Sequence, residues 1–452
     1  MQKFTKSKKY KILSHQLIPG GAHTYSKGDD QFPIDSPGFI EKGNGCWVWD
    51  IDGNKFLDWG MALRSISIGY CNKKIDKMVI KELKKGINFT RPSLKEIKLA
   101  ELLKKIIPSA EMVKFCKNGS DATSAAVRLS RAYTKKNLIL RCLDQPFFSV
   151  GDWFIGNTVV NSGIPDSIKK LTKYFKYNDI NFLKKIINKY KNNIACIILE
   201  PASTEEPKRK FLQQIRKICT EKKIVLIFDE IITGFRWHLS GAQKYYNVKP
   251  DLSTFGKSIA NGYPLSVLVG KRKIMKLGGI KHKERKVFLL SSTYGAETLS
   301  LTAALETIKI LKKNNIIIRN WKLGKKLKED GNKIFKKNKI YDYIKISGIS
   351  ISPYIIFKNS FCYEKCKLKK LCNKNLCLKT KTFFLEEMIK QNILIPYISF
   401  SASHTINEVN YTLKAFNEFA KKFREKLSTN SQFINNDIKS KETVMPVFRE
   451  YN

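Results

Sequence analysis

The stretch Ile224-Val-Leu-Ile-Phe-Asp-Glu-Ile231 decides the fold of this chain. Its apolar residues form a run typical of a strand buried on both faces, and the first polar residue, Asp229, follows at the carboxyl end. Ligands of open α/β sheets bind at this end of the strands. Because a buried carboxylate must be paired to stay charged, we expect Asp229 to face a cationic partner. Taken alone, Asp229 is also explained as a helix N-cap or, with Glu230, as a metal-binding acidic pair.

A second stretch, Leu252-Ser-Thr-Phe-Gly-Lys-Ser-Ile-Ala-Asn-Gly-Tyr-Pro-Leu265, places Lys257 among small and apolar residues. A lone lysine in so lysine-rich a chain is ordinarily a solvated surface group. This setting, however, disfavours a charged ammonium, lowers the pKa of a lysine and favours imine formation with an aldehyde. Together, Lys257 and Asp229 are suited to hold pyridoxal phosphate (PLP), with the aldehyde on the lysine and the protonated pyridine nitrogen on the carboxylate.

A phosphate site is indicated by Cys116-Lys-Asn-Gly-Ser-Asp-Ala-Thr-Ser-Ala-Ala-Val-Arg128, in which Asn118, Gly119 and Ser120 open a predicted helix. Backbone amides at a helix N-terminus, a glycine and hydroxyl groups suit a phosphate dianion. The alternative is an Asn-Gly turn followed by a capping residue. The stretch Ser291-Ser-Thr-Tyr-Gly295, before a predicted helix, offers further hydroxyl groups or a simple cap.

Apolar strand-like runs alternate with amphipathic helical stretches through the middle of the chain, which predicts an α/β fold with a mostly parallel sheet covered on both faces. The predicted strands are Asn137–Cys142, Ile194–Glu200, Ile224–Asp229 and Leu265–Gly270. The predicted helices include Ile97–Ile107, Ala122–Tyr133, Ile180–Tyr190, Phe211–Glu221 and Leu299–Leu311. We expect an N-terminal segment with a β-hairpin turning at Asp52-Gly-Asn54, a large domain, a smaller α+β domain and a polar tail, over residues 1–70, 71–310, 311–428 and 429–452.

The bulk composition supports a packed globular protein, with 452 residues and 42% apolar residues. A formal charge of +45 would ordinarily indicate a nucleic-acid or anionic-membrane partner. Arginine, which is favoured for phosphate and base contacts, supplies only a minor share of the 84 basic residues, so we attribute the charge to a lysine-rich solvated surface. The sequence has no signal-peptide pattern and no apolar run of about 18 residues, so we expect a cytoplasmic protein without a nucleic-acid or membrane partner.

Four of the ten cysteines cluster among lysines and are weak candidates for metal ligands: Cys362, Cys366, Cys372 and Cys377. Clustered thiols can bind soft metals. Their spacing, however, matches neither a zinc ribbon nor a common ferredoxin motif, so free thiols are favoured and no metal is predicted. The other six cysteines lie in apolar surroundings and are predicted to be reduced core residues.

Five motifs follow one another along the chain: Ile18-Pro-Gly-Gly21, Trp49-Asp-Ile-Asp-Gly53, Asn118-Gly-Ser-Asp-Ala122, Asp229-Glu-Ile-Ile-Thr-Gly-Phe-Arg236 and Gly256-Lys-Ser-Ile-Ala-Asn-Gly-Tyr-Pro264. With these motifs, over roughly residues 15 to 420, the chain resembles the class III aminotransferases of the fold-type I PLP enzymes. Within that family it is most similar to the glutamate-1-semialdehyde 2,1-aminomutase-like branch. The resemblance implies a large PLP-binding domain with a smaller domain, and the transfer of an amino group between small molecules.

The resemblance also implies a role for each matching residue. Lys257 would form the internal aldimine and move the proton, and Asp229 would hold the pyridine nitrogen. Gly119 and Ser120, next to Asn118, would hold the phosphate. Thr293 would reach the phosphate of the neighbouring subunit, so a homodimer with a shared site would be the working unit.

Three segments depart from the family's pattern. Asp144-Gln-Pro-Phe-Phe-Ser149 stands where the family has an aromatic-His-Gly string, so Phe147 or Phe148 would stack on the ring. Gly20-Gly-Ala-His-Thr-Tyr-Ser26 and Asn88-Phe-Thr-Arg-Pro-Ser93 differ from the corresponding aminomutase segments. These two segments supply the candidate substrate residues Tyr25 and Arg91. Arg91 is a candidate because a carboxylate substrate favours a fork-shaped cation. Arg91 is otherwise explained as a surface residue at a helix start.

The predicted function is therefore a class III aminotransferase that moves an amino group from an amine donor to a carbonyl acceptor. Glutamate-1-semialdehyde 2,1-aminomutase, which transfers the group within one molecule, is the alternative, since both reactions use the same residues. A basic nucleic-acid- or metal-binding protein on a degenerate enzyme scaffold is a distant alternative. The intact set of Asp229, Lys257 and Ser120 argues against it.

Overall fold

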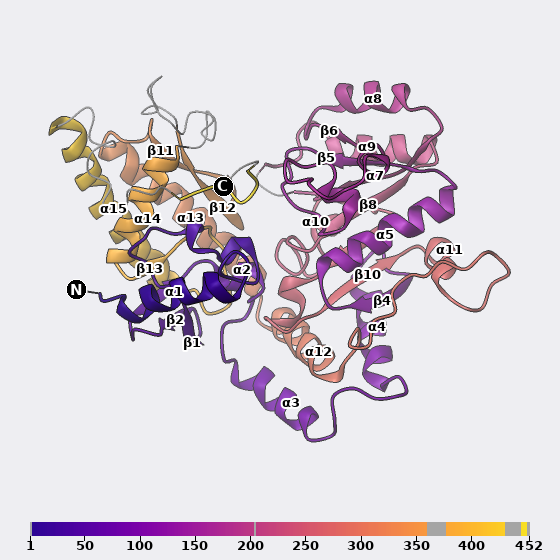
Figure 1. Ribbon diagram of the computed structural model, residues 1–452, viewed down its shortest axis with the longest axis horizontal. Helices are drawn as coiled ribbons and strands as arrows, with labels where there is room; N and C mark the ends of the chain where they lie inside the picture. Colours follow the sequence, from indigo (N-terminus) through magenta and orange to yellow (C-terminus); the bar gives the residue numbers. More distant parts are fainter. Residues whose placement is uncertain (1, 203–204, 359–376, 430–443, 450–452) are drawn as a thin grey trace. The chain divides into compact units, whose positions relative to one another are not determined.

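A computed structural model describes residues 2–202, 205–358, 377–429 and 444–449 of the chain (Figure 1). Two compact units can be separated, and each is described by itself. Unit 1 comprises Met1–Leu63, Ile68–Asn72 and Ile318–Asn452, and unit 2 comprises Arg64–Ser67 and Lys73–Ile317. Beside these units, the four-part division into residues 1–70, 71–310, 311–428 and 429–452 stays a prediction.

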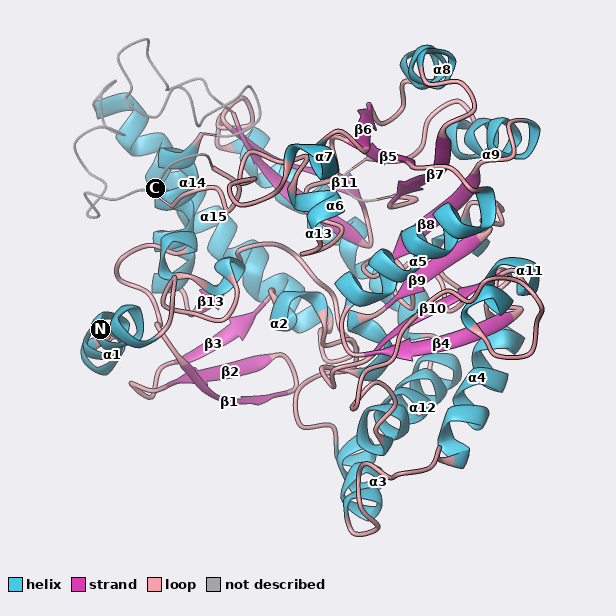
Figure 2. Cartoon of the chain, turned by 45° about the vertical axis from the view of Figure 1, so that its right-hand side comes forward, coloured by secondary structure: helices cyan, strands magenta, loops and turns pink. Residues whose placement is uncertain are grey.

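Unit 2 is built on a seven-stranded sheet in the order β4-β10-β9-β8-β7-β5-β6, with helices packed around it (Figure 2). The strands are β4 (Met112–Cys116), β5 (Leu138–Cys142), β6 (Thr172–Phe175), β7 (Ile194–Leu199), β8 (Val225–Glu230), β9 (Leu252–Phe255) and β10 (Ser266–Gly270). Strands β6, β5, β7, β8 and β9 are parallel, whereas β10 is antiparallel to both β9 and β4. The predicted mostly parallel α/β sheet is confirmed, and strand Leu265–Gly270 proves to be its antiparallel member.

The order and direction of these strands bring the ends of four strands to the same edge of the sheet. Because β4 and β9 are both antiparallel to β10, they run in the same direction. The register pairs Glu230 with Phe255, Phe255 with Val267, and Ser266 with Cys116. The carboxyl ends of β8, β9 and β4 therefore meet the start of β10. The two decisive stretches and the predicted phosphate segment lie at this edge.

The predicted helices of unit 2 are confirmed, and each begins and ends within a few residues of its predicted position. The long helices are α3 (Lys73–Leu83), α4 (Leu94–Ile106), α5 (Gly119–Thr134), α8 (Ile180–Lys189), α9 (Phe211–Glu221) and α12 (Thr298–Lys313). Shorter ones are α6 (Asp152–Ile155), α7 (Asp166–Lys169), α10 (Ala242–Tyr245), α11 (Arg272–Met275) and the 3-10 helices η3 (Lys257–Ala260) and η4 (Lys276–Gly278). Helix α5 packs against β4, β7, β8, β9 and β10, and α12 contacts α3, α4 and η3.

Unit 1 has a four-stranded sheet in the order β1-β2-β3-β13 and the separate hairpin β11-β12. Its strands are β1 (Ile40–Asn44), β2 (Trp47–Asp50), β3 (Lys55–Asp58), β11 (Ile344–Ile349), β12 (Ser352–Phe357) and β13 (Ile393–Leu394). Its helices are α1 (Thr5–Leu17), most of α13 (Ile316–Lys337), α14 (Leu378–Lys390) and α15 (Ile406–Thr429). It also has the 3-10 helices η1 (Tyr25–Lys27) and η2 (Asp29–Gln31). The short α2 (Met61–Arg64) lies where the two units meet in sequence. The hairpin predicted around Asp52-Gly-Asn54 is confirmed, since β2 and β3 pair antiparallel on either side of it.

Two predictions from composition can be compared with the described residues. None of the helices in the described ranges is both long enough and apolar enough to cross a membrane. Five of the six scattered cysteines are buried and free, but Cys71 is exposed, so its prediction as a core residue was wrong. Cys71 precedes α3 in a turn with φ of 50°, outside the packed layers.

Candidate functional site

A cavity of about 330 Å³ lies within unit 2 and includes this edge of the sheet. Its lining contains seven residues that the sequence singled out: Asn118, Gly119, Ser120, Phe147, Phe148, Asp229 and Lys257. The remaining lining comes from Ser65, Lys117, Glu200, Ile231, Ile232 and residues 262–266. The volume is at the lower end of the range for small-ligand and cofactor sites.

Asp229 is buried at the carboxyl end of β8. Its Oδ1 accepts hydrogen bonds from the Ile231 amide at 3.0 Å and from the Thr254 hydroxyl at 3.2 Å. Burial raises the pKa of Asp229 to about 6, although the Ile231 amide, the Lys257 ammonium and the Thr254 hydroxyl act to lower it. The carboxylate is therefore charged at neutral pH and suited to one cationic partner inside the cavity.

Glu230 does not share this environment, because successive strand residues point to opposite faces of a sheet. Its carboxylate accepts hydrogen bonds from the Thr233 hydroxyl at 2.7 Å and the Ala242 and Gln243 amides at 2.5 and 2.9 Å. The two carboxylates therefore do not converge on a shared metal, which contradicts the acidic-pair interpretation of Asp229.

Lys257 is the first residue of η3, directly after β9, and its φ of 43° lies in the left-handed region. Such strain at a non-glycine residue is typical of functional sites. Burial lowers the pKa of Lys257, while the charges of Asp229 and Glu200 raise it and those of Arg64 and Arg236 lower it further. A buried amine with a lowered pKa is a better nucleophile and proton acceptor than a solvated ammonium.

Two glycines bring the backbone close to the cavity wall. A Cβ atom on Gly256 would lie 2.5 Å from Ser266 Oγ and 3.0 Å from Ile231 Cδ1. A Cβ atom on Gly119 would lie 3.1 Å from the same Ile231 atom. Side chains at these positions would therefore crowd the space between Lys257 and the start of α5.

The start of α5 has the features of an anion site. Asn118 caps the helix, since its side chain accepts from the Asp121 amide at 2.9 Å. Within the described residues, the amides of Gly119 and Ser120 have no acceptor, as is usual in the first turn of a helix. The Ser120 hydroxyl accepts from the Val150 amide at 3.1 Å. Free amides and the dipole of a 16-residue helix favour a phosphate here.

Phe147 and Phe148, in the segment 144–149 that differs from the family's pattern, differ in solvent exposure. Phe148 is 2% exposed, and its carbonyl accepts from the Thr123 hydroxyl at 2.8 Å. Phe147 is 43% exposed. Both rings contact Phe154 edge-on, with ring centroids 5.7 Å apart. Phe148 is therefore held in the core, while Phe147 keeps much of its ring free.

Glu200 is a cavity residue that the sequence reasoning missed. It follows β7 directly, is buried, and has its backbone amide and carbonyl bonded to the Gln145 side chain at 2.8 and 2.7 Å. Its Oε2 atom has no hydrogen-bond partner among the residues that the structure describes. Burial and the nearby Asp229 raise the pKa of Glu200 to about 8, against the lowering effects of Lys257 and Arg64. The raised pKa favours the protonated carboxyl group, which can donate a hydrogen bond.

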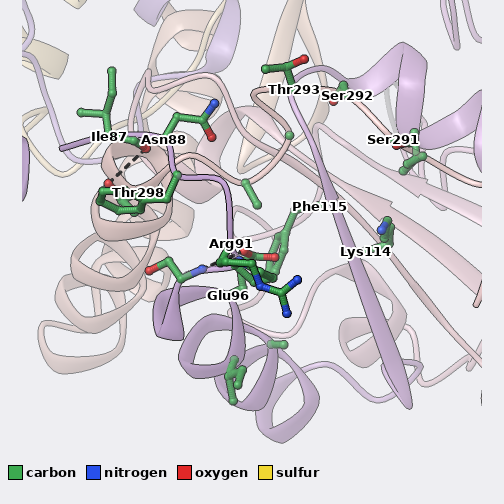
Figure 3. Close-up of a pocket in the computed structure, with 18 of the residues that line it drawn as sticks. Ile87, Asn88, Arg91, Glu96, Lys114, Phe115, Ser291, Ser292, Thr293 and Thr298 are labelled. Carbon is green, nitrogen blue, oxygen red and sulfur yellow. Dashed lines mark hydrogen bonds between the residues drawn. The ribbon is translucent and has the colours of Figure 1, made fainter.

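Three predicted residues are absent from the lining of this cavity. Thr293 and Arg91 line another pocket of unit 2, of about 680 Å³, together with Asn88, Lys114, Ser291 and Ser292 (Figure 3). Arg91 precedes α4 but does not cap it, since Ser93 and Glu96 form the capping box. Tyr25 belongs to unit 1, in η1, and is 71% exposed.

The cysteine cluster falls mostly outside the described residues. Cys362, Cys366 and Cys372 lie there, and Cys377 is buried at the start of α14. Across the described ranges, no group of three or more His, Cys, Asp or Glu side chains is arranged to hold a metal ion. The prediction about these thiols remains a prediction.

Known proteins are similar to this chain in both sequence and structure. A family model described as aminotransferase class-III matches residues 25–360. The chain is 34% identical over 415 residues to 3-aminobutyryl-CoA aminotransferase of Cloacimonas acidaminovorans, covering 89% of this chain and 94% of that protein. It is 33% identical over 401 residues to glutamate-1-semialdehyde 2,1-aminomutase of Sulfurisphaera tokodaii, covering 84% of this chain and 92% of that protein. Its structure is similar to the PLP internal aldimine form of the FumI protein of Sphingopyxis sp. MTA144, with a TM-score of 0.83, 25% identity, and coverage of 94% and 98%.

Proposed function

The chain belongs to the class III aminotransferase family, and from this premise we propose that Lys257 and Asp229 form the catalytic centre of a PLP-dependent enzyme that moves an amino group from a small-molecule amine donor to a carbonyl acceptor. PLP is the cofactor of this family and of the similar structure. The observation that carries the residue assignment is the cavity at the sheet edge. It combines a buried amine, a buried carboxylate and the free amides of a helix N-terminus.

The chemistry of these groups fits PLP at each of its ends. Lys257 would attach the aldehyde, Asp229 would pair with the protonated ring nitrogen, and Asn118, Gly119 and Ser120 would hold the phosphate. Phe147 would stack on the ring, because much of its surface is free while Phe148 is held in the core. When bound, PLP supplies an electron sink for the carbanion at the amino-bearing carbon of the substrate.

The proton chemistry falls to Lys257. Its Nζ would take the proton from the substrate carbon and later return a proton. Burial lowers the pKa of this amine, which favours its neutral, proton-accepting form. Asp229 would keep the ring nitrogen protonated, since a charged carboxylate in this cavity needs a cationic partner.

The internal transfer of an aminomutase is the second candidate, because relatives of both kinds match most of the chain. The two reactions differ in whether the first carbonyl product leaves before the second amination. A single substrate converted without any added amine donor or carbonyl acceptor would support the aminomutase. Strict dependence on a donor–acceptor pair would support the external aminotransferase.

The working unit is proposed to be a cytoplasmic homodimer in which Thr293 reaches the partner's cofactor phosphate. Thr293 lines the pocket that also contains Arg91, which is the candidate contact for an anionic substrate group. Large apolar side chains are exposed in the same segments: Ile87, Phe89, Leu94, Ile97, Phe288 and Tyr294. Exposed apolar side chains in this number are typical of a protein–protein interface.

Phe89→Glu is expected to dissociate this dimer. Phe89 is 51% exposed and lines the pocket that contains Thr293. An aromatic residue that becomes buried in an interface is often a hot spot of binding. A charge at that position should raise the dissociation constant by roughly 30-fold or more, measured by sedimentation. Ile318→Glu, at a position of unit 1 that is 59% exposed, is the control. Equal effects of both substitutions would contradict the assigned interface.

The proposed chemistry is tested by the visible spectrum of the purified protein. We expect an absorption band of bound PLP that borohydride bleaches, and peptide mapping should place the reduced cofactor on Lys257. A protein that stays colourless after added PLP would overturn the proposal. A label on another lysine would overturn the residue assignment alone.

Glu200→Gln is expected to flatten the pH dependence of stability in the cofactor-free protein. Because folding raises the pKa of Glu200 from 4.5 to about 8, the stabilising contribution is fully present below pH 4.5 and is lost as the pH rises through about 8. Each unit of pKa shift corresponds to about 1.4 kcal/mol. Denaturant unfolding across this range should show the wild type losing free energy of unfolding relative to the variant. The control is Glu221→Gln, on the surface of α9; wild-type and Glu200→Gln profiles that run parallel would refute the assignment.

A further inference from the structure

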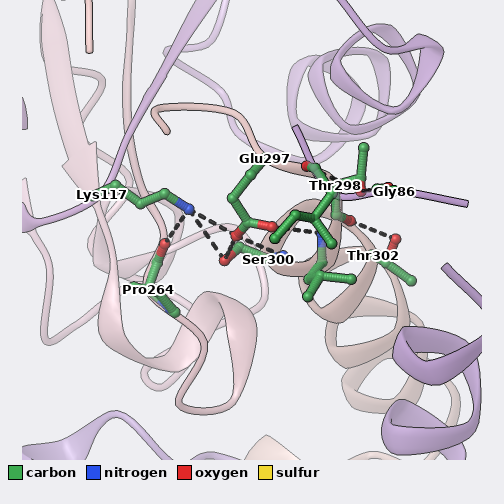
Figure 4. A network of polar contacts seen from close by, with 9 residues as sticks. Gly86, Lys117, Pro264, Glu297, Thr298, Ser300 and Thr302 are labelled. Carbon is green, nitrogen blue, oxygen red and sulfur yellow. Dashed lines mark hydrogen bonds and ion pairs between the residues drawn. The ribbon is translucent and has the colours of Figure 1, made fainter. Parts of the chain in front are cut away.

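A network of polar contacts at the sheet edge joins three segments of unit 2 through Lys117 (Figure 4). Lys117 Nζ lies 2.7 Å from Glu297 Oε1, and it donates to the Pro264 carbonyl at 3.1 Å and the Ser300 hydroxyl at 3.4 Å. Lys117 immediately precedes Asn118, the cap of α5, and it lines the cavity. The side chains of Lys117 and Glu297 are 21% and 12% exposed, so the ion pair is largely removed from water.

Glu297 anchors the other end of the network. Its carboxylate caps α12 by accepting from the Leu299 amide at 2.7 Å and the Ser300 amide at 3.0 Å, and it also accepts from the Ser300 hydroxyl. Burial by itself would raise the pKa of Glu297, but hydrogen bonds from Lys117 and Ser300 hold it below its ordinary value. Residues 291–296, which include Thr293, lead directly into this cap.

The start of α12 also holds the segment that contains Arg91. The Thr298 amide donates to the Ile87 carbonyl at 2.9 Å, and the Thr298 hydroxyl lies 3.3 Å from the Gly86 and Ile87 carbonyls. Four segments are therefore connected to one helix start. They are the start of α5, the turn after η3, the loop with Thr293 and the segment with Arg91.

We propose that Lys117 and Glu297 are a positioning pair that couples phosphate binding at the start of α5 to the placement of Thr293 toward a second subunit. The inference rests on the proposed function and on the proposed dimer. An ammonium group has three protons, and Glu297, Pro264 and Ser300 provide three acceptors for them. Lys117 is therefore assigned to hold the cavity wall rather than to bind the phosphate.

The test measures PLP affinity of the cofactor-free protein by absorbance titration, and subunit association by sedimentation. Lys117→Met and Glu297→Gln should each weaken PLP binding by about tenfold and weaken dimer formation. The double variant should bind no more weakly than either single one, because the two residues act as a unit. Lys117→Arg, which keeps the charge, should restore most of the affinity.

The controls separate positioning from a general loss of stability. Lys217→Met and Glu221→Gln break an exposed ion pair of 3.9 Å on α9 and should leave PLP affinity unchanged. Thermal unfolding of each cofactor-free variant shows whether it is folded, and Glu297→Gln retains an oxygen that can cap α12.

Four outcomes would overturn the proposal. Unchanged or tighter PLP binding in Glu297→Gln would mean that Lys117 contacts the phosphate directly once it is released from Glu297. Additive losses in the double variant would mean that the residues act separately. A wild-type protein that binds no PLP would overturn the proposed function and this inference together, whereas wild-type-like variants of a PLP-binding protein would overturn only this inference.

Discussion

Lys257→Ala is expected to reduce amino transfer by about 10⁴-fold, because it removes both the proposed attachment point of the cofactor aldehyde and the group proposed to move the proton. The cavity should survive, since its wall is formed by backbone and by side chains that do not depend on Lys257. The variant should therefore still take up PLP, without a lysine that borohydride can label. Turnover of a donor–acceptor pair and the absorption spectrum measure the two effects separately.

Two further substitutions define what Lys257 contributes. Lys257→Arg keeps the positive charge next to Asp229 but offers no deprotonated amine, so it should be as inactive as the alanine variant. Lys273→Ala removes an exposed lysine of α11 and should turn over like the wild type. An arginine variant with substantial activity would show that charge, not proton transfer, is the contribution of Lys257.

Asp229→Asn is expected to lower turnover by roughly 10²–10³-fold, the size of the penalty for breaking a buried charge pair. A neutral amide would no longer keep the ring nitrogen protonated. The fold should tolerate the change, because asparagine can still accept from the Ile231 amide and the Thr254 hydroxyl. Turnover and thermal unfolding, measured on the same preparation, test both statements.

Glu230, the residue after Asp229, provides a matched control, because its substitution should affect stability and not turnover. Glu230 is equally buried but accepts several hydrogen bonds from residues 233–243. Glu230→Gln would put an amide donor against those donors and should destabilise the protein by about 3 kcal/mol. The remaining folded protein should keep its turnover per PLP bound. If Glu230→Gln lost turnover and Asp229→Asn did not, the two roles would be reversed.

The sequence predicted the strands that are dominated by apolar residues and missed β9, which has two buried polar side chains among its four residues. Strands β7 and β8 read as continuous apolar runs, and both were predicted. Strand β9 was missed because it buries Ser253 and Thr254, whose hydroxyl groups are satisfied by Ser109 and Asp229. Hydrophobic periodicity cannot detect polar side chains whose partners come from elsewhere in the chain.

Helix α1 was missed for a related reason. Its residues, Thr5–Leu17, are rich in lysine, and its amides at Lys6 and Ser7 donate to the carboxylate of Asp52 at 2.7 and 2.9 Å. The residue that caps this helix is thus supplied by the turn of a hairpin far along the sequence. No local capping signal was available to mark the helix start.

The cavity residues that could be predicted from the sequence are those whose neighbours in the sequence indicate burial. Lys257 stood out from the other lysines because glycine and apolar residues flank it, and Asp229 because it ends an apolar run. Glu200 ends the apolar run of β7 in the same way, and this signal could have identified it. Lys117 could not be distinguished from the 84 basic residues, because its acceptors at residues 264, 297 and 300 come together only in the folded chain.

The antiparallel direction of β10 has a consequence for how Lys257 can move. A parallel neighbour of β9 would require a long crossover, whereas the antiparallel strand needs only the short span between Phe255 and Ser266. Both ends of this span are held by ladder hydrogen bonds inside the sheet. The span that carries Lys257 is therefore anchored in the sheet at both of its ends. In the proposed reaction, proton delivery would then need only the rotation of this one side chain.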